Sequence, residues 1–206
     1  MASLGQWLVG LFVFLGPIGT LLGLLVVFVV DAAIVPTLPE LAFVVTYGLV
    51  AETFGSWVWG AALLAIALAG EGIGNTLLYL FVRRVLIEKG RMPGILSNAM
   101  RRWTKFLVVR DERIILVNRV APVVPFVGAF VATLGWSYRK SISYVLIGSF
   151  AKYSFLLGLV VGLDLVYDPT TAMLITIATV LVLIVVSLVG SVIVRRRMAR
   201  LSGKTG

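Results

Sequence analysis

The chain has 206 residues, of which 60% are hydrophobic and 13% are charged, and its formal net charge is +9. Ordinary soluble domains carry roughly 25% charged residues, and a folded domain of this size still leaves roughly a quarter to a third of its unfolded-chain surface in solvent. A chain this apolar is therefore not a soluble globular enzyme, a disordered tail or a fibre. Its main solvent is lipid.

The sequence contains no cysteine and no histidine. Disulfides, thiolate metal sites, and the commonest zinc ligand and general base are thereby excluded. A nucleotide-binding glycine loop is also missing from the sequence. We therefore expect a protein that is not an enzyme and that uses no cofactor or metal, and in which the basic excess reflects membrane topology rather than nucleic-acid binding.

The sequence predicts an all-α polytopic membrane protein with about four transmembrane helices and two opposed re-entrant helical hairpins. A bilayer core about 30 Å thick needs ~20 apolar residues of helix, and four runs satisfy this requirement. In chain order the predicted elements are a first span (1–31), a re-entrant hairpin (32–55), a second span (56–84), a cytoplasmic amphipathic linker (85–110), a second re-entrant hairpin (111–137), a third span (138–163), a fourth span (169–195) and a basic cytoplasmic tail (196–206). The first apolar run continues to Val30, which is too long for a cleavable signal peptide.

Two apolar stretches are interrupted by prolines and by ionisable residues, Pro39-Glu40 in the first and Arg119 with Pro122 and Pro125 in the second. Such a stretch either crosses the membrane or enters halfway and returns as a hairpin. If both crossed, the nine bases of residues 83–113 would lie across the membrane from those of residues 139–140 and of the tail. If both return, the clustered bases share one face, which the positive-inside rule makes cytoplasmic.

This topology is an inverted repeat, because two hairpins enter from opposite faces and each is followed by a full span. Inverted repeats are typical of secondary transporters, in which broken segments meet near the bilayer midplane and form the substrate and ion site. Irregular backbone at that depth is tolerated only against protein or a water-filled cavity. The pattern therefore favours transport.

The linker between the two halves has apolar residues at helical spacing over residues 94–109, with Arg101, Arg102 and Lys105 between them. This spacing predicts a basic amphipathic helix that lies on the inner leaflet and is attracted to anionic lipid. An ordinary cytoplasmic connector is the alternative, and the sequence does not separate the two.

Five ionisable residues lie inside apolar segments, namely Glu40, Glu52, Glu71, Arg119 and Lys152. A charge within a span costs at least ~2.5–3.5 kcal/mol on insertion scales, so each of them is a functional candidate by default.

Glu71 is the strongest candidate for proton coupling, because it lies mid-span in a glycine-rich run, 69–74, that allows close helix approach and a bend. A structural ion pair with Arg119 or Lys152 is its alternative role. Asn75 lies one turn further on the same face. Glu40 would take and release protons if it is buried, or would be solvated at the outer mouth of the hairpin. The third candidate, Glu52, is expected to be interfacial.

Arg119, Lys152, Pro122, Pro125 and Asn75 are the predicted substrate-binding residues. The rigid fork of donors on a buried arginine suits phosphate or carboxylate, although Arg119 could also snorkel to the inner surface. Lys152, about midway along the third span, would pair with Glu71 or bind an anionic headgroup. The two prolines would break the second hairpin and expose carbonyl groups.

Four pieces of the chain carry a family resemblance: Pro39-Glu40, Gly70-x-x-x-Gly74-Asn75-x-x-x-Tyr79-x-x-x-Arg83, Arg119-x-x-Pro122-x-x-Pro125, and the helix from Gly148 to Gly162. In these pieces the chain resembles the DedA family of integral membrane proteins, which shares the VTT (SNARE-associated) domain. The resemblance covers the chain from about residue 30 to about residue 165. It implies flipping or scrambling of phospholipids or polyprenyl-phosphate carriers, with dependence on proton motive force in bacterial members.

The resemblance also assigns the hairpin acid of the family to Glu40 and its first hairpin arginine to Arg119. Asn75 stands where the family has an acid, with Glu71 one turn earlier as a substitute, and Pro125 stands where the family has a second arginine. The Arg-x-x-Pro-x-x-Pro form is more similar to the scramblase-type members.

On these grounds we expect a transporter in the cell membrane, with both termini in the cytoplasm, that moves an anionic phospholipid or polyprenyl-phosphate headgroup between leaflets. Two alternatives stay open: a proton-coupled exporter of small molecules or drugs that uses the same acids, and a non-transporting scaffold that works through its basic helix and tail. The expected partners are membrane lipids and protons, with no nucleic acid. The oligomeric state is open, with a homo-oligomer among the options.

Overall fold

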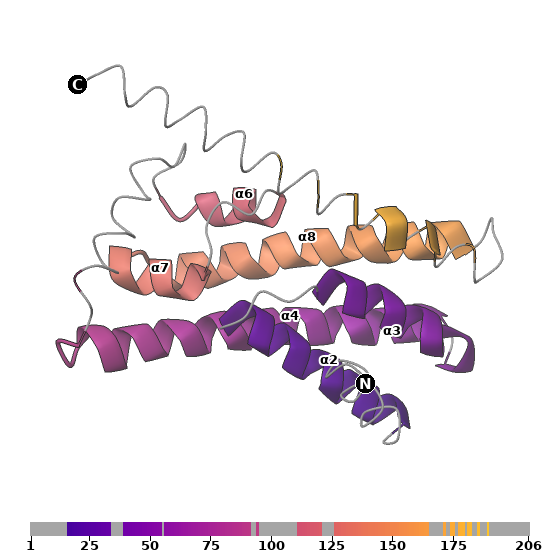
Figure 1. Cartoon of the computed structure of the whole chain (residues 1–206), viewed down its shortest axis with the longest axis horizontal. Coiled ribbons are helices and arrows are strands. Elements are labelled where there is room, and N and C mark those ends of the chain that lie inside the picture. The colour runs from indigo at the N-terminus through magenta and orange to yellow at the C-terminus, as the bar shows by residue number, and fades with distance from the viewer. Residues whose placement is uncertain are drawn as a thin grey trace, which may run out of the picture. The chain divides into compact units, whose positions relative to one another are not determined.

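The computed structural model describes residues 16–33, 39–54, 56–91, 94, 111–120 and 126–164, together with ten positions between 171 and 189. For residues 49–54, 56, 119, 120, 163 and 164 it describes the backbone alone. This part of the chain is helical and contains no strand (Figure 1). Its elements are α2 (Gly16–Ala33), α3 (Pro39–Phe54), α4 (Ser56–Phe81), the π-helix η1 (Val82–Ile87), α6 (Ile114–Val120), α7 (Val127–Leu134) and α8 (Tyr138–Asp164).

Three stretches of helix are long and apolar enough to cross a membrane: Gly16–Ala33, Trp57–Ile87 and Tyr138–Gly162. They correspond to the first, second and third predicted spans, so the all-α class and these three helices are confirmed. The fourth predicted span (169–195) lies outside the described residues apart from the ten positions. The basic tail (196–206) and most of the amphipathic linker (94–109) also lie outside them.

The helix starts follow from proline and charge. Pro17 lies in the first turn of α2, directly after Gly16, whose φ is +68°. Pro39 is the first residue of α3, a position at which its missing N–H costs nothing, because the first turn of a helix has no intrahelical acceptor for it. Glu40 lies in that same first turn, where the helix dipole favours a negative charge.

The end of α4 differs from the predicted end of the second span. The helix continues beyond Arg84 as η1, in which the N–H of Glu88 bonds the carbonyl of Arg83 at 2.9 Å, a bond to the fifth preceding residue. The chain stops being helical near Gly90, whose φ of +64° suits glycine. The helix therefore extends into the first residues of the predicted linker, 85–87.

The chain divides into two compact units, and the divisions fall within α4 and within α8. Unit 1 comprises Met1–Gly74 and Ser149–Val180, and unit 2 comprises Asn75–Gly148 and Leu181–Gly206. Each unit is described by itself below.

In unit 1, α2 packs against α3 and against the first part of α4. A Cβ atom on Gly70 would lie 2.4 Å from Cβ of Phe28, and one on Gly74 would lie 2.6 Å from the carbonyl oxygen of Val29. These two glycines therefore allow the helices to approach closely, as the glycine-rich run predicted. The core of the unit is aromatic: Phe28, Phe43, Tyr47 and Tyr153 are almost fully buried.

In unit 2, α7 packs against the end of α4 and against η1. A Cβ atom on Gly128 would lie 2.4 Å from the carbonyl oxygen of Asn75 and 2.9 Å from the amide nitrogen of Tyr79. Because both of these atoms are backbone, only glycine fits the crossing without a shift of one helix. Around this crossing, residues of α4, η1, α6, α7 and α8 form a continuous apolar core, which includes Ile115 and Phe130.

The second predicted hairpin returns on itself. Its two helices, α6 and α7, flank residues 121–125, which lie outside the described residues with Pro122 and Pro125 among them. Phe126, directly after this break, has the left-handed φ of 53°. The N–H of Ser137 donates to Oε1 of Glu112 at 3.0 Å, so the two ends of the segment meet. Entry of this hairpin into a membrane stays a prediction.

The first predicted hairpin has a different outcome. From Pro39 to Phe54 the backbone is one helix, and residues 34–38 lie outside the described residues. No turn therefore interrupts α3 itself, and the re-entrant form of this segment stays a prediction.

Candidate functional site

A partly buried ion pair joins α3 to α8 within unit 1. Nζ of Lys152 donates to Oε1 of Glu40, and their side chains are 24% and 18% exposed. Glu40 comes from the first turn of α3 and Lys152 from near the middle of α8, 112 residues away in sequence. The sequence singled out both residues, and it offered Lys152 two roles, pairing with Glu71 or binding an anionic headgroup. Among the described residues, the acid bonded to Lys152 is Glu40.

Aromatic rings pack beside this ion pair. Nζ of Lys152 lies 5.2 Å from the ring centroid of Tyr153, a distance at which the cation and the ring attract each other. The ring of Tyr153 in turn packs edge-on against Phe28 at 5.1 Å and against Phe43 at 5.3 Å. The pair therefore lies against a dry aromatic core, where electrostatic interactions are stronger than in water.

Ser149 adds a polar atom one turn before Lys152 on α8. Its side chain is fully buried, and its hydroxyl has no hydrogen-bond partner among the described residues. An unsatisfied buried hydroxyl costs about 1–3 kcal/mol, so it calls for an explanation. Sequence reasoning missed Ser149, although its spacing of three residues from Lys152 places both on neighbouring positions of one helix face.

Glu71 lies on the buried stripe of α4 and is only 2% exposed. Gly70 and Gly74 on either side of it contact α2 closely, which explains how a charged residue comes to lie inside the helix packing. Glu71 is thus buried in unit 1, the unit that also contains the Glu40–Lys152 pair. Its role in proton coupling stays a prediction.

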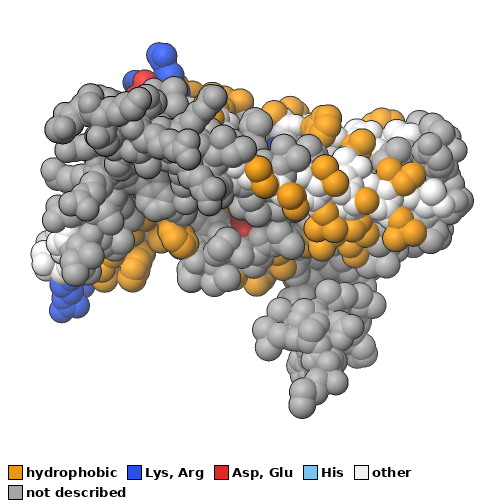
Figure 2. Space-filling view, turned by 45° about the horizontal axis from the view of Figure 1, so that its top comes forward, with side chains coloured by type: hydrophobic (Ala, Val, Ile, Leu, Met, Phe, Trp, Pro, Cys, Tyr) orange, Lys and Arg blue, Asp and Glu red, His pale blue; other side chains and the backbone are white. Residues whose placement is uncertain are grey.

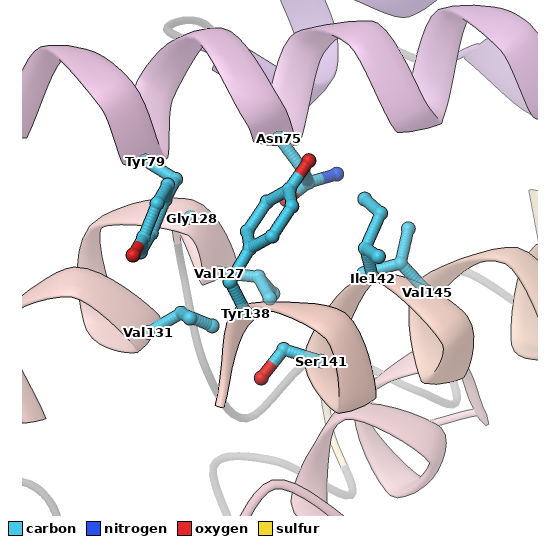
Figure 3. A pocket seen from close by; sticks show the side chains of 9 residues that line it. All are labelled: Asn75, Tyr79, Val127, Gly128, Val131, Tyr138, Ser141, Ile142 and Val145. Atoms are coloured by element: carbon cyan, nitrogen blue, oxygen red, sulfur yellow. The ribbon is translucent and has the colours of Figure 1, made fainter. Parts of the chain in front are cut away.

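Asn75 belongs to unit 2, where it lines a small cavity with residues of α4, α7 and α8 (Figure 3). The side chain of Tyr138 rises from the start of α8 toward α4 and ends beside Asn75 (Figure 3). The cavity measures about 10 Å³, which is close to the minimum for a single water molecule. It is therefore too small for a lipid headgroup.

A chain of polar contacts runs along this end of α4. The hydroxyl groups of Thr76 and Tyr138 share a hydrogen bond of 2.8 Å, and the rings of Tyr138 and Tyr79 stack at 4.7 Å. Arg83 donates to the hydroxyl of Tyr79 and lies 3.5 Å from the carboxylate of Glu88. These contacts join the start of α8 to the end of α4 and therefore stabilise the packing of the two helices. The recurrence of Thr76, Tyr79 and Arg83 at helical spacing is the sequence signal for this row.

The acid of the second hairpin, Glu112, titrates differently from an isolated glutamate. The hydrogen bond from the N–H of Ser137 and one from its own N–H lower the pKa of Glu112, because both stabilise the carboxylate form. Lys140 and Arg113 act in the same direction. Glu112 therefore ties the two ends of the hairpin together as an anion.

The remaining predicted site residues are placed only in part. Arg119 lies in α6 and Glu52 in α3, and the structure describes the backbone of both but not their side chains. Pro122 and Pro125 lie outside the described residues. Whether Arg119 meets Glu71 thus stays a prediction. Within the described part of the chain, no group of three or more Asp, Glu, His or Cys residues could hold a metal ion.

Comparisons with protein-family models, with curated proteins and with solved structures give no match to this chain. The DedA resemblance therefore rests on the motifs alone. The feature of the site that bears most directly on function is the Glu40–Lys152 pair.

Proposed function

We propose that the protein is a membrane transporter that moves an anionic phospholipid or polyprenyl-phosphate headgroup between leaflets. The observation that carries this proposal is the Glu40–Lys152 ion pair inside an apolar helix bundle. Replacing a buried pair by apolar residues of similar size is often neutral or stabilising by ~1–4 kcal/mol, so stability alone does not account for two charges here. An ionisable pair of this kind within apolar helices is typical of a substrate or ion pathway.

The surface of the helices suits a lipid substrate. Large hydrophobic side chains cover much of the described surface, whereas Lys and Arg side chains gather at a few places (Figure 2). On α8, Ile147, Phe150 and Phe155 are more than half exposed. Acyl chains can stay against such a surface while only the headgroup needs a polar path.

The proposal assigns separate roles to the charged residues. Arg119 and Lys152 would bind the headgroup, and Pro122 and Pro125 would line its path. Glu40 and Glu71 would carry protons or balance the buried positive charge, with Glu52 at the interface. The second hairpin, whose ends meet at Glu112 and Ser137 and whose first helix carries Arg119, would enter the membrane.

Family and location are part of the same proposal. The motifs from Glu40 to Arg119 support membership of the DedA family, and the two opposed hairpins would then form its inverted repeat. A cell-membrane location with both termini in the cytoplasm follows from the positive-inside rule applied to the bases of residues 83–113 and 139–140.

Reconstitution tests the proposal. The purified chain is placed in vesicles with a fluorescent phosphatidylglycerol, and translocation is followed as the fraction of label that an impermeant reductant can bleach. We expect Glu71→Gln and Arg119→Ala to slow translocation by about tenfold or more, because a charge-assisted contact contributes ~1.5–3 kcal/mol. Lys140→Gln, an exposed lysine of α8, serves as the control and should leave the rate unchanged.

Three results would contradict the proposal. Unchanged translocation in both variants would remove the site assignment. Drug-dependent proton flux without lipid movement would favour an exporter. If the two variants impair folding alone, while removal of Arg101, Arg102 and the tail abolishes function, the protein is a scaffold.

A further inference from the structure

We propose that Lys152 and Ser149 form a binding site for a phosphodiester oxyanion, that Glu40 occupies this site as an internal competitor, and that each bound anion is accompanied by one proton. The inference rests on the proposed function in so far as the anion is a lipid headgroup. The site itself is defined by the contacts of unit 1.

Lys152 lies at the border between two faces of α8. Ser149, Tyr153 and Leu156 are buried, whereas Phe150 and Phe155 are 53% and 62% exposed. The Lys152 side chain, at 24% exposure, lies between these faces. A headgroup can therefore reach Lys152 sideways from the lipid, while its acyl chains remain against the exposed phenylalanines.

Ser149 supplies a hydrogen-bond donor in addition to those of the Lys152 ammonium. Its buried hydroxyl has no hydrogen-bond partner among the described residues and lies one turn from Lys152. Glu40 satisfies one donor of the lysine ammonium, which has three. A phosphodiester has two non-bridging oxygens that share one negative charge, so one group can accept from both Lys152 and Ser149. No other base occurs among the described residues of unit 1, so Lys152 is the cation there for an anion to bind.

Charge balance links the anion to a proton. With Glu40 bound, the site holds one positive and one negative charge and is neutral. If a phosphodiester monoanion takes the place of Glu40, the freed carboxylate would be an uncompensated charge against the aromatic core. One proton from water neutralises Glu40, and the site is neutral again, with lysine and anion paired. The exchange moves no electrons and forms no covalent bond to the substrate.

Unit 1 contains other titratable groups besides Glu40 and Lys152. They are Asp31 on α2, Tyr47 and Glu52 on α3, Glu71 on α4, and Tyr153 and Asp164 on α8. Of the described side chains of unit 1, Lys152 is the one that is bonded to Glu40. Glu40 is therefore the acid whose charge the arriving anion would displace.

Calorimetry of the full-length protein in detergent tests the site without any transport assay. The probe is dioctanoyl phosphatidylglycerol, with dioctanoyl phosphatidylcholine as the zwitterionic lipid and dimethyl phosphate as the free diester. Titrations in two buffers of different ionisation enthalpy count the protons. We expect uptake of one proton per phosphatidylglycerol and a tenfold tighter binding for each unit fall in pH. Binding without proton uptake would overturn the proposal.

Variants assign the residues. Glu40→Gln should bind phosphatidylglycerol at least as tightly as the wild type, with no proton uptake and no pH dependence. Lys152→Gln should weaken binding at least tenfold, whereas Lys140→Gln on the same helix should not. Ser149→Ala should weaken binding several-fold, and Ser143→Ala, whose exposed hydroxyl bonds the carbonyl of Arg139, should not. Equal binding in Lys152→Gln or retained proton uptake in Glu40→Gln would refute the exchange.

The charge-swapped variant separates this site from a purely structural pair. Glu40→Lys combined with Lys152→Glu restores an ion pair but moves the cation away from Ser149. Recovery of wild-type binding by the swap would show that the pair is structural and would overturn the proposal. Should Lys152→Gln not fold, the proton count of the wild type and the Ser149→Ala comparison still decide.

Failure of the site and failure of the proposed function are distinguishable. Lysine-dependent binding of phosphatidylglycerol by a protein that moves no lipid would remove the transport function and keep the site. Lipid translocation that is unchanged in Lys152→Gln would keep the function and remove the site. Binding of dimethyl phosphate as tight as that of the lipid would identify the ligand as a free phosphodiester rather than a headgroup.

Discussion

The two units of the chain carry charge in opposite ways. Among the described residues, unit 1 contains five acids and one base, Lys152, whereas unit 2 contains three acids and eight bases. The bases of unit 2 are exposed wherever their side chains are described. Those exposed bases are Arg83, Arg84, Lys89, Arg91, Arg113, Arg139 and Lys140. The single base of unit 1 is largely buried and paired with Glu40.

This difference shows that charged residues occur in two kinds of environment in one apolar chain. In the proposed topology, the exposed bases of unit 2 would lie where the helices meet water and anionic lipid headgroups, and they would decide the orientation. A charge in unit 1 has to be compensated by a neighbour, because lipid-facing helices offer it no water. The acids and the lysine of unit 1 are therefore residues on which a transport function would depend, together with Arg119 of unit 2.

The largest effect expected from this comparison comes from breaking the buried pair on one side. Lys152→Met leaves Glu40 as an uncompensated charge and should destabilise the protein by about 3–5 kcal/mol. The double variant with Glu40→Gln should recover most of that loss. Unfolding in mixed detergent, followed by the loss of helical signal, measures both.

The matched pair in unit 2 is Arg83–Glu88, whose side chains are each 57% exposed. Glu88→Gln should change the unfolding free energy by less than about 1 kcal/mol, because exposed ion pairs contribute little. A loss in Glu88→Gln as large as in Lys152→Met would mean that the two units do not differ in how they hold charge.

Close packing on glycine is a feature that the units share, and it sets the next effect. Gly128→Ala in unit 2 and Gly74→Ala in unit 1 would each bring a Cβ atom within 2.6 Å of a backbone atom. Each should destabilise the protein by about 1–3 kcal/mol, because helices have to move apart. Thermal unfolding of the purified variants measures this.

Gly158 on α8 is the control for both glycine variants. A Cβ atom there meets no described atom within 4 Å. Gly158→Ala should therefore stabilise the helix by roughly 0.5–1 kcal/mol, since alanine has the higher helix propensity. If Gly158→Ala destabilises the protein as much as Gly128→Ala, the glycines do not act through close packing.

Much of the helical architecture was predictable from the sequence, and the pairing of the site was not. Apolar runs of about 20 residues predict spans, and the glycines around Glu71 predicted close packing, because both signals are local. The partner of Lys152 is set by how α3 and α8 meet, and that contact joins residues far apart in sequence. Glu40 and Glu71 are both glutamates within apolar segments, so hydropathy alone did not show which of them pairs with Lys152.

The two predicted hairpins show the same limit of prediction from the sequence. Prolines predicted a break in both segments, yet α3 is continuous from Pro39 because proline is tolerated at the first helical position. The second segment returns on itself through a contact between Glu112 and Ser137. A side-chain bond to a backbone N–H across 25 residues has no signature in periodicity.

The hydrogen bond between Ser137 and Glu112 gives the smallest expected effect, a pH dependence of the unfolding free energy that Glu112 contributes. The pKa of Glu112 is lowered in the folded protein by the N–H of Ser137. Its stabilising effect is therefore fully present above the pKa of an unfolded glutamate and is lost as the pH falls through the lowered value.

Glu112→Gln, which does not titrate, should remove this acid-side loss, with a difference under about 1 kcal/mol because the group is near the surface. The measurement is the unfolding free energy of wild type and variant against pH. If Glu112→Gln leaves the wild-type slope unchanged, the hairpin is not tied at Glu112, and the acid response of unit 2 comes from general surface charge.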